Sequence, residues 1–271
     1  MIKFENLMFK NDFLFSAVCN ENPEIVRKMT EVITGRKITK IHNLRQQDWV
    51  TADPILKKVR LDVTFEGDDA IYCVEMQVST EKEIEKRIRY YQSAKDIEQI
   101  NDGGRYEELQ PLYIIFICDY DPFGDGLQKY SFHNRCEETG EYLEDGRDII
   151  VLNTRGEETE DVSLNTLLDY IRTGEVREDD LTQEIEEASE RVRYNKDWRE
   201  RFMTIGEKME RLAEQRAAEA REQERIQGIK NTVLAMRSVG ASEEKIKQVV
   251  CELNDLTPEK YDSILSEMKT Q

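Results

Sequence analysis

The sequence lacks the features of a membrane or secreted protein. No stretch approaches the roughly 18 consecutive apolar residues of a transmembrane helix. The N-terminus has no basic segment followed by an apolar run and a small-residue cleavage site, which a secretory signal requires. We therefore expect a soluble, cytoplasmic protein with no membrane partner.

Cysteine and histidine, which can bind metals or act as nucleophiles, are also scarce. The five cysteines are odd in number, widely spread and without a C-x-x-C pair, so we expect reduced core residues rather than a zinc or redox site. The two histidines, His42 and His133, are too far apart in sequence to suggest a metal pair or a Ser/His/Asp arrangement. We expect each to have a structural or surface role.

Positive charge is in short supply, because 39 Lys and Arg against 57 Asp and Glu leave the chain at -18. Sequence-independent DNA binding needs basic surface to displace counterions, so this balance disfavours a general nucleic-acid or anionic-membrane coat. The net charge still allows a local basic groove. With 271 residues, 38% of them hydrophobic, the chain has ample material for a buried core in one large domain or two ordinary ones.

The hydrophobic pattern changes near residue 175. Before it, apolar runs and alternating segments lie between Gly, Pro, Asn and Asp clusters, and after it almost everything is typical of helix. We predict a mixed α/β domain over 1–174, a charged helical linker or dimerisation segment over 175–225, and a small helical unit over 226–271. Within the first domain we predict helices over 13–33, with a break at Asn22-Pro23, and over 81–100, and strands over 60–65, 71–78, 112–118, 130–136 and 149–152.

The strands over 60–65 and 71–78 form a predicted β-hairpin, because both alternate and a Glu-Gly-Asp-Asp turn signal separates them. A two-residue turn at Asp68-Asp69 pairs Leu61 with Met76, Val63 with Val74 and Phe65 with Tyr72 on one apolar face. The other face then pairs Asp62 with Glu75 and Arg60 with Gln77. Asp-Asp is a weaker turn signal than Asn-Gly, and a slip of two residues would leave the acids diagonal on one face.

Carboxylates directly opposed across a ladder, near an apolar core, repel each other. Either Asp62 or Glu75 takes a proton, or a cation lies between them. A hard divalent ion with oxygen ligands, above all Mg2+, is the functional solution. The alternative is that both acids lie separately on a solvated sheet face. The hairpin pattern by itself leaves both alternatives open.

Asp62 and the run Glu75-Met76-Gln77 resemble the D…E-x-K core of PD-(D/E)XK nucleases, with Gln in the place of Lys. Several longer segments occur in a characteristic order along the chain. Together they resemble the Rpn, or recombination-promoting nuclease, family of transposase-like PD-(D/E)XK proteins. The resemblance covers about residues 3–156. The segments that carry it are 12–15, 60–62, 74–77, 87–91, 103–109 and 117–123.

This resemblance implies a restriction-endonuclease-like fold and metal-dependent hydrolysis of DNA phosphodiester bonds. It implies that Asp62 and Glu75 bind the metal together with the carbonyl oxygen of Met76. Asp12 matches an additional acidic position of the family, which would bind the metal directly or through water. The implied ion is Mg2+, with Mn2+ as an alternative, and the implied partner is DNA.

Gln77 is the main departure from the parent motif. A Lys supplies positive charge or helps to deprotonate water, whereas Gln only donates and accepts hydrogen bonds and cannot be a general base. If the site is active, the metal must lower the pKa of its bound water while Gln77 orients that water. Gln is usual in the Rpn family, so the change favours slow turnover or strict metal dependence rather than a dead enzyme.

The helix predicted over 81–100 begins directly after the second hairpin strand, near Glu75 and Gln77. We expect Lys86, Arg87 and Tyr91 on this helix to bind substrate phosphates. The alternative is that its bases are solvated charges paired with neighbouring glutamates. Arg87 and Tyr91 belong to the segment that resembles the Rpn family, which favours these two.

After residue 175 a thin apolar stripe predicts a docking face or a short coiled-coil seam, and hence a homodimer formed through the helical tail. The stripe consists of Trp198, Phe202, Ile205, Met209 and Leu212. Beyond residue 226 the pattern could suit a helix-turn-helix module, but five acids and two bases over 251–271 argue against groove binding. Docking of a partner is the favoured role.

The first functional hypothesis is a DNA endonuclease that acts in recombination, mobile-element biology or defence. The second is a catalytically weak, nuclease-derived binding or regulatory protein that acts through its helical tail. An RNA nuclease is a third alternative, although the sequence has no aromatic-rich platform for single strands. Asp119, Asp121 and Asp125 have a superficial calcium-loop spacing, but Pro122-Phe123 interrupts it and no Glu follows, so we predict a strand end and a turn.

Overall fold

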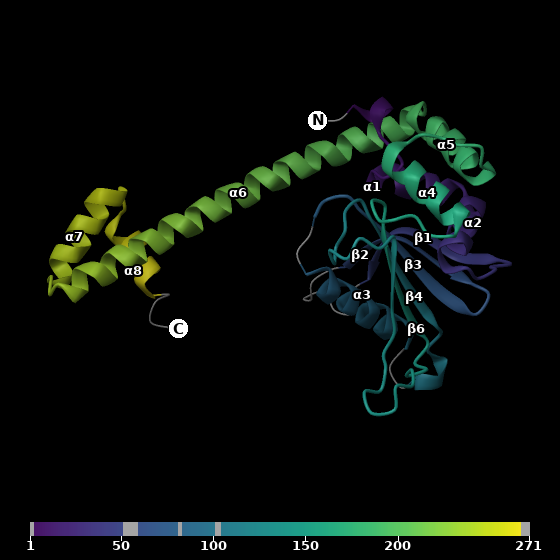
Figure 1. The fold of residues 1–271 in the computed structure, drawn as a ribbon. Coiled ribbons are helices and arrows are strands. Elements are labelled where there is room, and N and C mark those ends of the chain that lie inside the picture. Colours follow the sequence, from purple (N-terminus) through teal and green to yellow (C-terminus); the bar gives the residue numbers. More distant parts are fainter. Residues whose placement is uncertain (1–2, 51–58, 81–82, 101–103, 267–271) are drawn as a thin grey trace. The chain divides into compact units, whose positions relative to one another are not determined.

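The computed structural model describes residues 3–50, 59–80, 83–100 and 104–266, without the side chains of 46–50, 59–60, 208–210 and 212–213. The chain divides into two compact units, Met1–Phe202 and Met203–Gln271 (Figure 1). Among the described residues, no helix is both long and apolar enough to cross a membrane.

The first unit is built on a mixed six-stranded sheet with the strand order β1-β2-β3-β4-β6-β5 in the described residues. β1, β2 and β3 are antiparallel neighbours, β3, β4 and β6 run parallel, and β5 pairs antiparallel with β6. The predicted restriction-endonuclease-like mixed α/β fold is thereby confirmed. The strands are β1 (Ile41–Val50), β2 (Val59–Gly67), β3 (Ala70–Gln77), β4 (Leu112–Cys118), β5 (Lys129–Phe132) and β6 (Arg147–Asn153).

Helices cover both faces of the sheet, and each face has its own apolar cluster (Figure 1). One cluster includes residues of α1 (Asp12–Glu21), α2 (Pro23–Thr34), α4 (Val162–Thr173) and α5 (Asp180–Arg193). The other includes Ile84 and Ile88 of α3 (Ile84–Gln99). Every residue of β4 is buried between the two layers, which explains the uninterrupted apolar run in its sequence.

Local sequence signals set the limits of the first two helices. The Asn11 side chain caps α1 by accepting hydrogen bonds from the N–H groups of Phe13 and Leu14. Pro23 occupies the first turn of α2, where its missing N–H costs nothing. Gly35 ends α2 in the left-handed conformation, with φ 69°. The predicted break at Asn22-Pro23 therefore separates two helices.

Two strand predictions need correction. β1 was not predicted, because Ile41–Val50 is a mostly polar edge strand whose sequence lacks an apolar run. The strand predicted over 130–136 ends at Phe132. Beyond it, Arg135 makes only an isolated bridge to Tyr142. Strand formation at both places depends on what lies beside the segment rather than on its own pattern.

The first unit continues well beyond residue 174, where the sequence pattern changes. Ile185 and Val192 of α5 and Trp198 at the start of the next helix are buried in the same cluster as α1 and α2. The Trp198 indole N–H donates to Glu21 Oε1 at 2.6 Å, and its ring packs edge-on against Phe13. Residues 175–202 therefore share the core of the sheet domain, and a separate functional role for 175–225 stays a prediction.

The predicted dimer stripe is divided by this packing. Trp198 is buried in the first unit and Phe202 packs against it, so neither lies on an open face. Ile205 is 38% exposed, and the side chains of Met209 and Leu212 lie outside the described residues. Homodimerisation through the tail stays a prediction.

The second unit has a small apolar core of its own. The long helix α6 (Lys196–Ser238) contributes Ile229 and Val233 from its last turns. α7 (Glu243–Asn254) contributes Ile246 and Val250, and α8 (Pro258–Ser266) contributes Tyr261 and Ile264. The Ser242 side chain caps α7 by accepting from the Lys245 N–H, as its position in the sequence predicts.

Candidate active site

The β2–β3 hairpin has the register that the alternating pattern predicts. Val63 pairs with Val74, Phe65 with Tyr72 and Gly67 with Ala70 around the Asp68-Asp69 turn. Val63, Phe65, Tyr72, Val74 and Met76 all lie in the cluster on the α1 side of the sheet. The side chains that alternate with them on β3, including Glu75 and Gln77, therefore point to the α3 side.

Leu61 departs from this prediction. It packs with Cys73, Ile84 and Ile88 in the cluster on the α3 side, not with Val63 and Phe65. The backbone pairing between β2 and β3 ends at Val63 and Val74. Beyond that pair the β3 ladder no longer dictates the direction of the β2 side chains.

Side-chain carboxylates replace the backbone ladder at this open end of the hairpin. The Asp62 N–H donates to Glu75 Oε1 at 2.7 Å, and the Met76 N–H donates to Asp62 Oδ2 at 3.0 Å. Asp62 is 6% exposed and Glu75 is 4% exposed. The two acids are thus brought together and oriented by the backbone of the opposite strand, because an N–H bond to a carboxylate is short and directional.

Gln77, two residues beyond Glu75, is held by hydrogen bonds at both ends of its amide. Its Nε2 donates to the Ser79 carbonyl oxygen at 2.7 Å, and its Oε1 accepts from Arg87 Nη1 at 2.8 Å. Gln77 is 7% exposed. The expected role of orienting water stays a prediction, and in this structure the amide oxygen engages the guanidinium of α3.

Arg87 and Tyr91 lie together on the face of α3 that covers the sheet. Arg87 Nη2 donates to the Tyr91 hydroxyl at 3.1 Å. The guanidinium carbon also lies 5.5 Å from the Tyr91 ring centre and 5.6 Å from that of Phe116, within the range of cation–π attraction. Of the three predicted phosphate-binding residues, Arg87 bonds to Gln77 and Tyr91 bonds to Arg87.

The charges of the site act on neighbouring groups on both faces of the sheet. Burial raises the pKa of Tyr91, and the negative charge of Glu75 raises it further. On the α1 side, burial and then the charge of Asp62 raise the pKa of the Cys19 thiol. Burial raises the pKa of Cys118 to about 12, although Arg87 acts in the opposite direction. These thiols and the phenol are therefore neutral near pH 7.

Lys86 and Asp12 occupy more exposed positions. Lys86 lies on the outer side of α3 in an ion pair with Glu83, and its side chain is 65% exposed. Asp12 is exposed in the first turn of α1, where its Oδ1 accepts from the Phe13 N–H at 2.8 Å. Phosphate binding by Lys86 and metal binding by Asp12 stay predictions.

The oxygen donors of this site suit a hard divalent ion. No group of three or more His, Cys, Asp or Glu within the described ranges is arranged to hold a metal. An ion would therefore use the two carboxylates, the predicted Met76 carbonyl oxygen and water, and such all-oxygen sets suit Mg2+. A carboxylate offers about four lone-pair sites, so accepting one backbone N–H is compatible with binding a cation.

Asp119, at the end of β4, forms a buried ionic cluster beside the site. Its N–H donates to the Gln77 carbonyl oxygen at 2.9 Å, and its carboxylate accepts from Lys10 Nζ at 2.8 Å and from the Thr154 hydroxyl at 2.9 Å. Arg155 adds a weaker ion pair at 3.3 Å. Burial alone would raise the Asp119 pKa, but the Lys10 and Thr154 hydrogen bonds outweigh it and the pKa is lowered.

Sequence reasoning treated Asp119 only as part of a strand end and turn. The turn itself is present, because Asp121 accepts hydrogen bonds from the Phe123 and Gly126 N–H groups. The role of Asp119 was missed because its partners Lys10 and Thr154 are distant in sequence. A lone acid at the end of a wholly apolar strand was the available signal.

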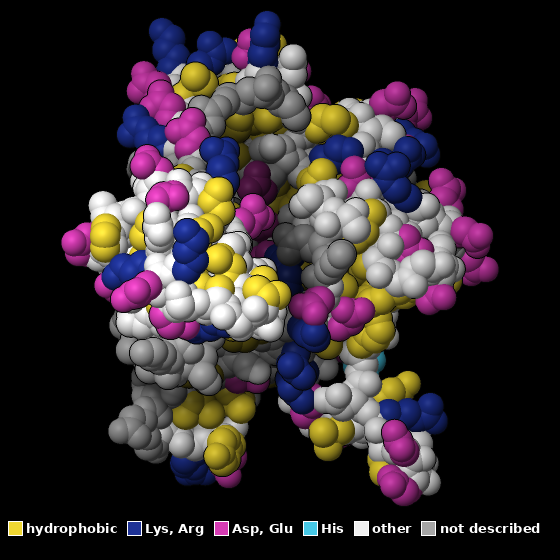
Figure 2. All heavy atoms as spheres, turned by 90° about the vertical axis from the view of Figure 1, so that its left-hand side faces the viewer, with side chains coloured by type: hydrophobic (Ala, Val, Ile, Leu, Met, Phe, Trp, Pro, Cys, Tyr) yellow, Lys and Arg dark blue, Asp and Glu magenta, His cyan; other side chains and the backbone are white. Residues whose placement is uncertain are grey.

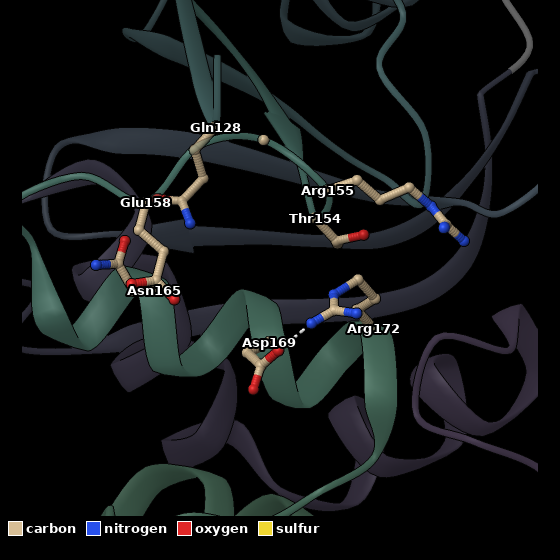
Figure 3. A pocket seen from close by; sticks show the side chains of 8 residues that line it. Gln128, Thr154, Arg155, Glu158, Asn165, Asp169 and Arg172 are labelled. Atoms are coloured by element: carbon tan, nitrogen blue, oxygen red, sulfur yellow. Dashed lines mark hydrogen bonds and ion pairs between the residues drawn. The ribbon is translucent and has the colours of Figure 1, made fainter. Parts of the chain in front are cut away.

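A polar pocket of about 230 Å³ lies next to this cluster, between the end of β6 and α4 (Figure 3). Its two arginines, Arg155 and Arg172, are matched by Glu158 and Asp169, so the lining carries no net charge. Arg172 pairs with Asp169, and the Arg155 guanidinium points away from the other lining side chains (Figure 3). The lining therefore offers no excess of positive charge to an anion.

The surface around these elements matches the acidic composition. Figure 2 shows one face of the molecule, on which Lys and Arg side chains are interspersed with Asp and Glu and do not gather into one broad basic area. Any contact with nucleic acid on this face would therefore be local.

The chain belongs to the family described as PD-(D/E)XK nuclease family transposase, whose family model matches residues 8–227. The match includes the hairpin acids, α3 and the Asp119 cluster, and it continues well past residue 156, where the resemblance seen in the sequence ends. No match was found among curated proteins or among solved structures.

Proposed function

We propose that this protein is a DNA endonuclease that requires a divalent metal ion, Mg2+ or Mn2+. The observation that carries the proposal is the reciprocal pair of hydrogen bonds that fixes Asp62 and Glu75 side by side, buried, at the open end of the hairpin. Two buried carboxylates held side by side repel each other when both are ionised, and a divalent ion bound between them would offset that repulsion. Membership of a nuclease family supports a phosphodiester substrate.

The chain's own groups supply binding and orientation. Asp62, Glu75 and the Met76 carbonyl oxygen would hold the ion, which supplies Lewis acidity and a bound water of lowered pKa. The backbone N–H groups of Asp62 and Met76 fix the carboxylate oxygens before substrate arrives. The low exposure of both acids reduces solvent screening, which strengthens their interaction with any charge placed beside them.

DNA binding would depend on local contacts. We infer that Arg87 and Tyr91, with Lys86 on the outer side of α3, contact phosphates next to the acids. Such contacts make affinity fall as salt rises, with a shallow slope if only a few phosphates are neutralised. Action in recombination, mobile-element biology or defence, a cytoplasmic location and a dimer formed through α6 are parts of the same proposal.

The test is cleavage of supercoiled plasmid DNA with Mg2+ or Mn2+, comparing the parent chain with Asp62→Asn and Glu75→Gln. These substitutions keep an oxygen that can accept the backbone N–H bonds and remove only the negative charge. We expect each to lower the cleavage rate by at least about 100-fold, the scale for losing one main electrostatic contribution. EDTA should abolish cleavage by the parent chain.

Glu66→Gln is the matched control, because Glu66 lies on the same strand and bonds to Asn43 instead. It should cleave at the parent rate. Equal residual cleavage by all four proteins would indicate a contaminant and favour the catalytically weak regulatory alternative. Cleavage of RNA but not DNA of the same sequence would assign the substrate to RNA.

A further inference from the structure

Gln77 stands where the parent E-x-K motif has its lysine. Both the oxygen and the nitrogen of its amide make hydrogen bonds. A guanidinium has only N–H donors, so Arg87 must face the amide oxygen of Gln77. The Ser79 carbonyl oxygen accepts from the other end and fixes the amide in that orientation. Gln77, which stands in the place of the lysine, therefore binds the Arg87 guanidinium, which belongs to α3.

Three further contacts make this cation part of the site. The Tyr91 hydroxyl accepts from Arg87, and the rings of Tyr91 and Phe116 flank the guanidinium. Phe116 is fully buried and Gln77 is 7% exposed, so water screens the charge less than it screens an exposed side chain. Burial and then the charge of Glu75 raise the pKa of Tyr91, and Arg87 lowers it, so Tyr91 lies near both charges.

We propose that Arg87 is a catalytic residue that supplies the positive charge which the parent motif takes from lysine, and that Gln77 is the residue that positions it. This inference rests on the proposed nuclease function. The guanidinium stays protonated at every working pH, so it stabilises negative charge that develops on the scissile phosphate and does not act as a base. Lys86 and Arg89 on the same helix are exposed and are not held in this way.

The test removes the positive charge of Arg87 and places a lysine at position 77, where the E-x-K motif has it. Plasmid cleavage is compared for the parent chain, Arg87→Met, Gln77→Met, the double variant Gln77→Lys with Arg87→Met, and the double variant Gln77→Met with Arg87→Met. We expect Arg87→Met to lose about 100-fold in rate, the scale for one transition-state donor. Gln77→Met should lose less, because the arginine is still present but less well placed.

The decisive comparison is between the two double variants. The Gln77→Lys double variant should cleave at least tenfold faster than Arg87→Met, whereas the Gln77→Met double variant should not recover. The rate of the Gln77→Lys double variant should also fall at high pH as the new lysine loses its proton, and the parent chain should lack that fall. A purely structural role for Arg87 would not produce a rescue that depends on charge and pH.

Arg89→Met is the control for loss of an exposed arginine from α3, and it should stay within threefold of the parent rate. Thermal melting of each variant identifies any that fails to fold. If the parent chain cleaves and Arg87→Met stays within threefold of it, or if the Lys rescue fails in a folded double variant, this inference is wrong and the nuclease function stands. If the parent chain shows no cleavage that Asp62→Asn removes, both proposals are wrong.

Discussion

The two ends of the β2–β3 hairpin are built in opposite ways. From Val63–Val74 to Gly67–Ala70, backbone pairs with backbone and apolar side chains pack beneath the strands. Beyond Val63 the acceptors are the carboxylates of Asp62 and Glu75, which are both buried. One end therefore stabilises the fold, and the other keeps two acids close together at a cost in stability.

This contrast explains how the chain itself fixes the positions of the two acids. A register slip at the closed end would expose Phe65 and Tyr72, whose rings stack 4.9 Å apart, so the apolar face fixes the pairing. The fixed pairing then aligns Asp62 with Glu75 at the open end. Apolar packing at the closed end therefore offsets the unfavourable burial of the two acids at the open end.

The largest expected effect on stability is at the closed end. Phe65 is fully buried, and Phe65→Ala removes its packing and leaves a cavity. We expect the free energy of unfolding to fall by about 3–5 kcal/mol, measured as a lower urea midpoint. A loss below 1 kcal/mol would mean that the closed end does not carry the stability of the hairpin.

At the open end, two substitutions of Glu75 should have opposite signs in EDTA. Glu75→Ala leaves the buried Asp62 N–H without its acceptor and should lower the free energy of unfolding by about 1–3 kcal/mol. Glu75→Gln keeps an acceptor and removes the like charge, so it should raise the free energy of unfolding by up to about 1 kcal/mol. Urea unfolding of both variants measures the difference, and a Gln variant less stable than the parent chain would contradict the interpretation that the acids repel.

The smallest effect concerns Asp119, a buried acid that has a cation beside it. Lys10→Met should lower the free energy of unfolding by about 1 kcal/mol at pH 7, because Lys10 is partly exposed and Arg155 remains. The pKa of Asp119 is lowered in the folded chain, so its contribution is complete above its unfolded value near 3.9 and is lost as pH falls through the folded value.

The stability difference between Lys10→Met and the parent chain should therefore be constant from pH 5 to 7 and shrink below about pH 4. Urea midpoints across this range measure it. A difference that grows as the pH falls would show that Lys10 acts on another group.

Much of the site was predictable from local pattern. Alternation over 60–65 and 71–78 predicted the strand pairing, and the pairing predicted that Asp62 would lie beside Glu75. The pattern failed where neighbours decide the outcome. β1 was missed because its polar sequence becomes a strand only through its pairing with β2. Leu61 packs on the α3 side of the sheet and not on the predicted α1 side, because the pairing with β3 stops at Val63.

The sequence by itself determined the hairpin, the break between α1 and α2, and the position of Asp62 beside Glu75, because these depend on alternation, turn residues and caps within a few positions. Tertiary structure alone decided that the Arg87 guanidinium bonds to the Gln77 amide and that Lys10 pairs with Asp119. Those pairs are separated by 10 and 109 residues, and only the packing of α3 and of the N-terminal segment against the strand ends brings their charges within hydrogen-bonding distance.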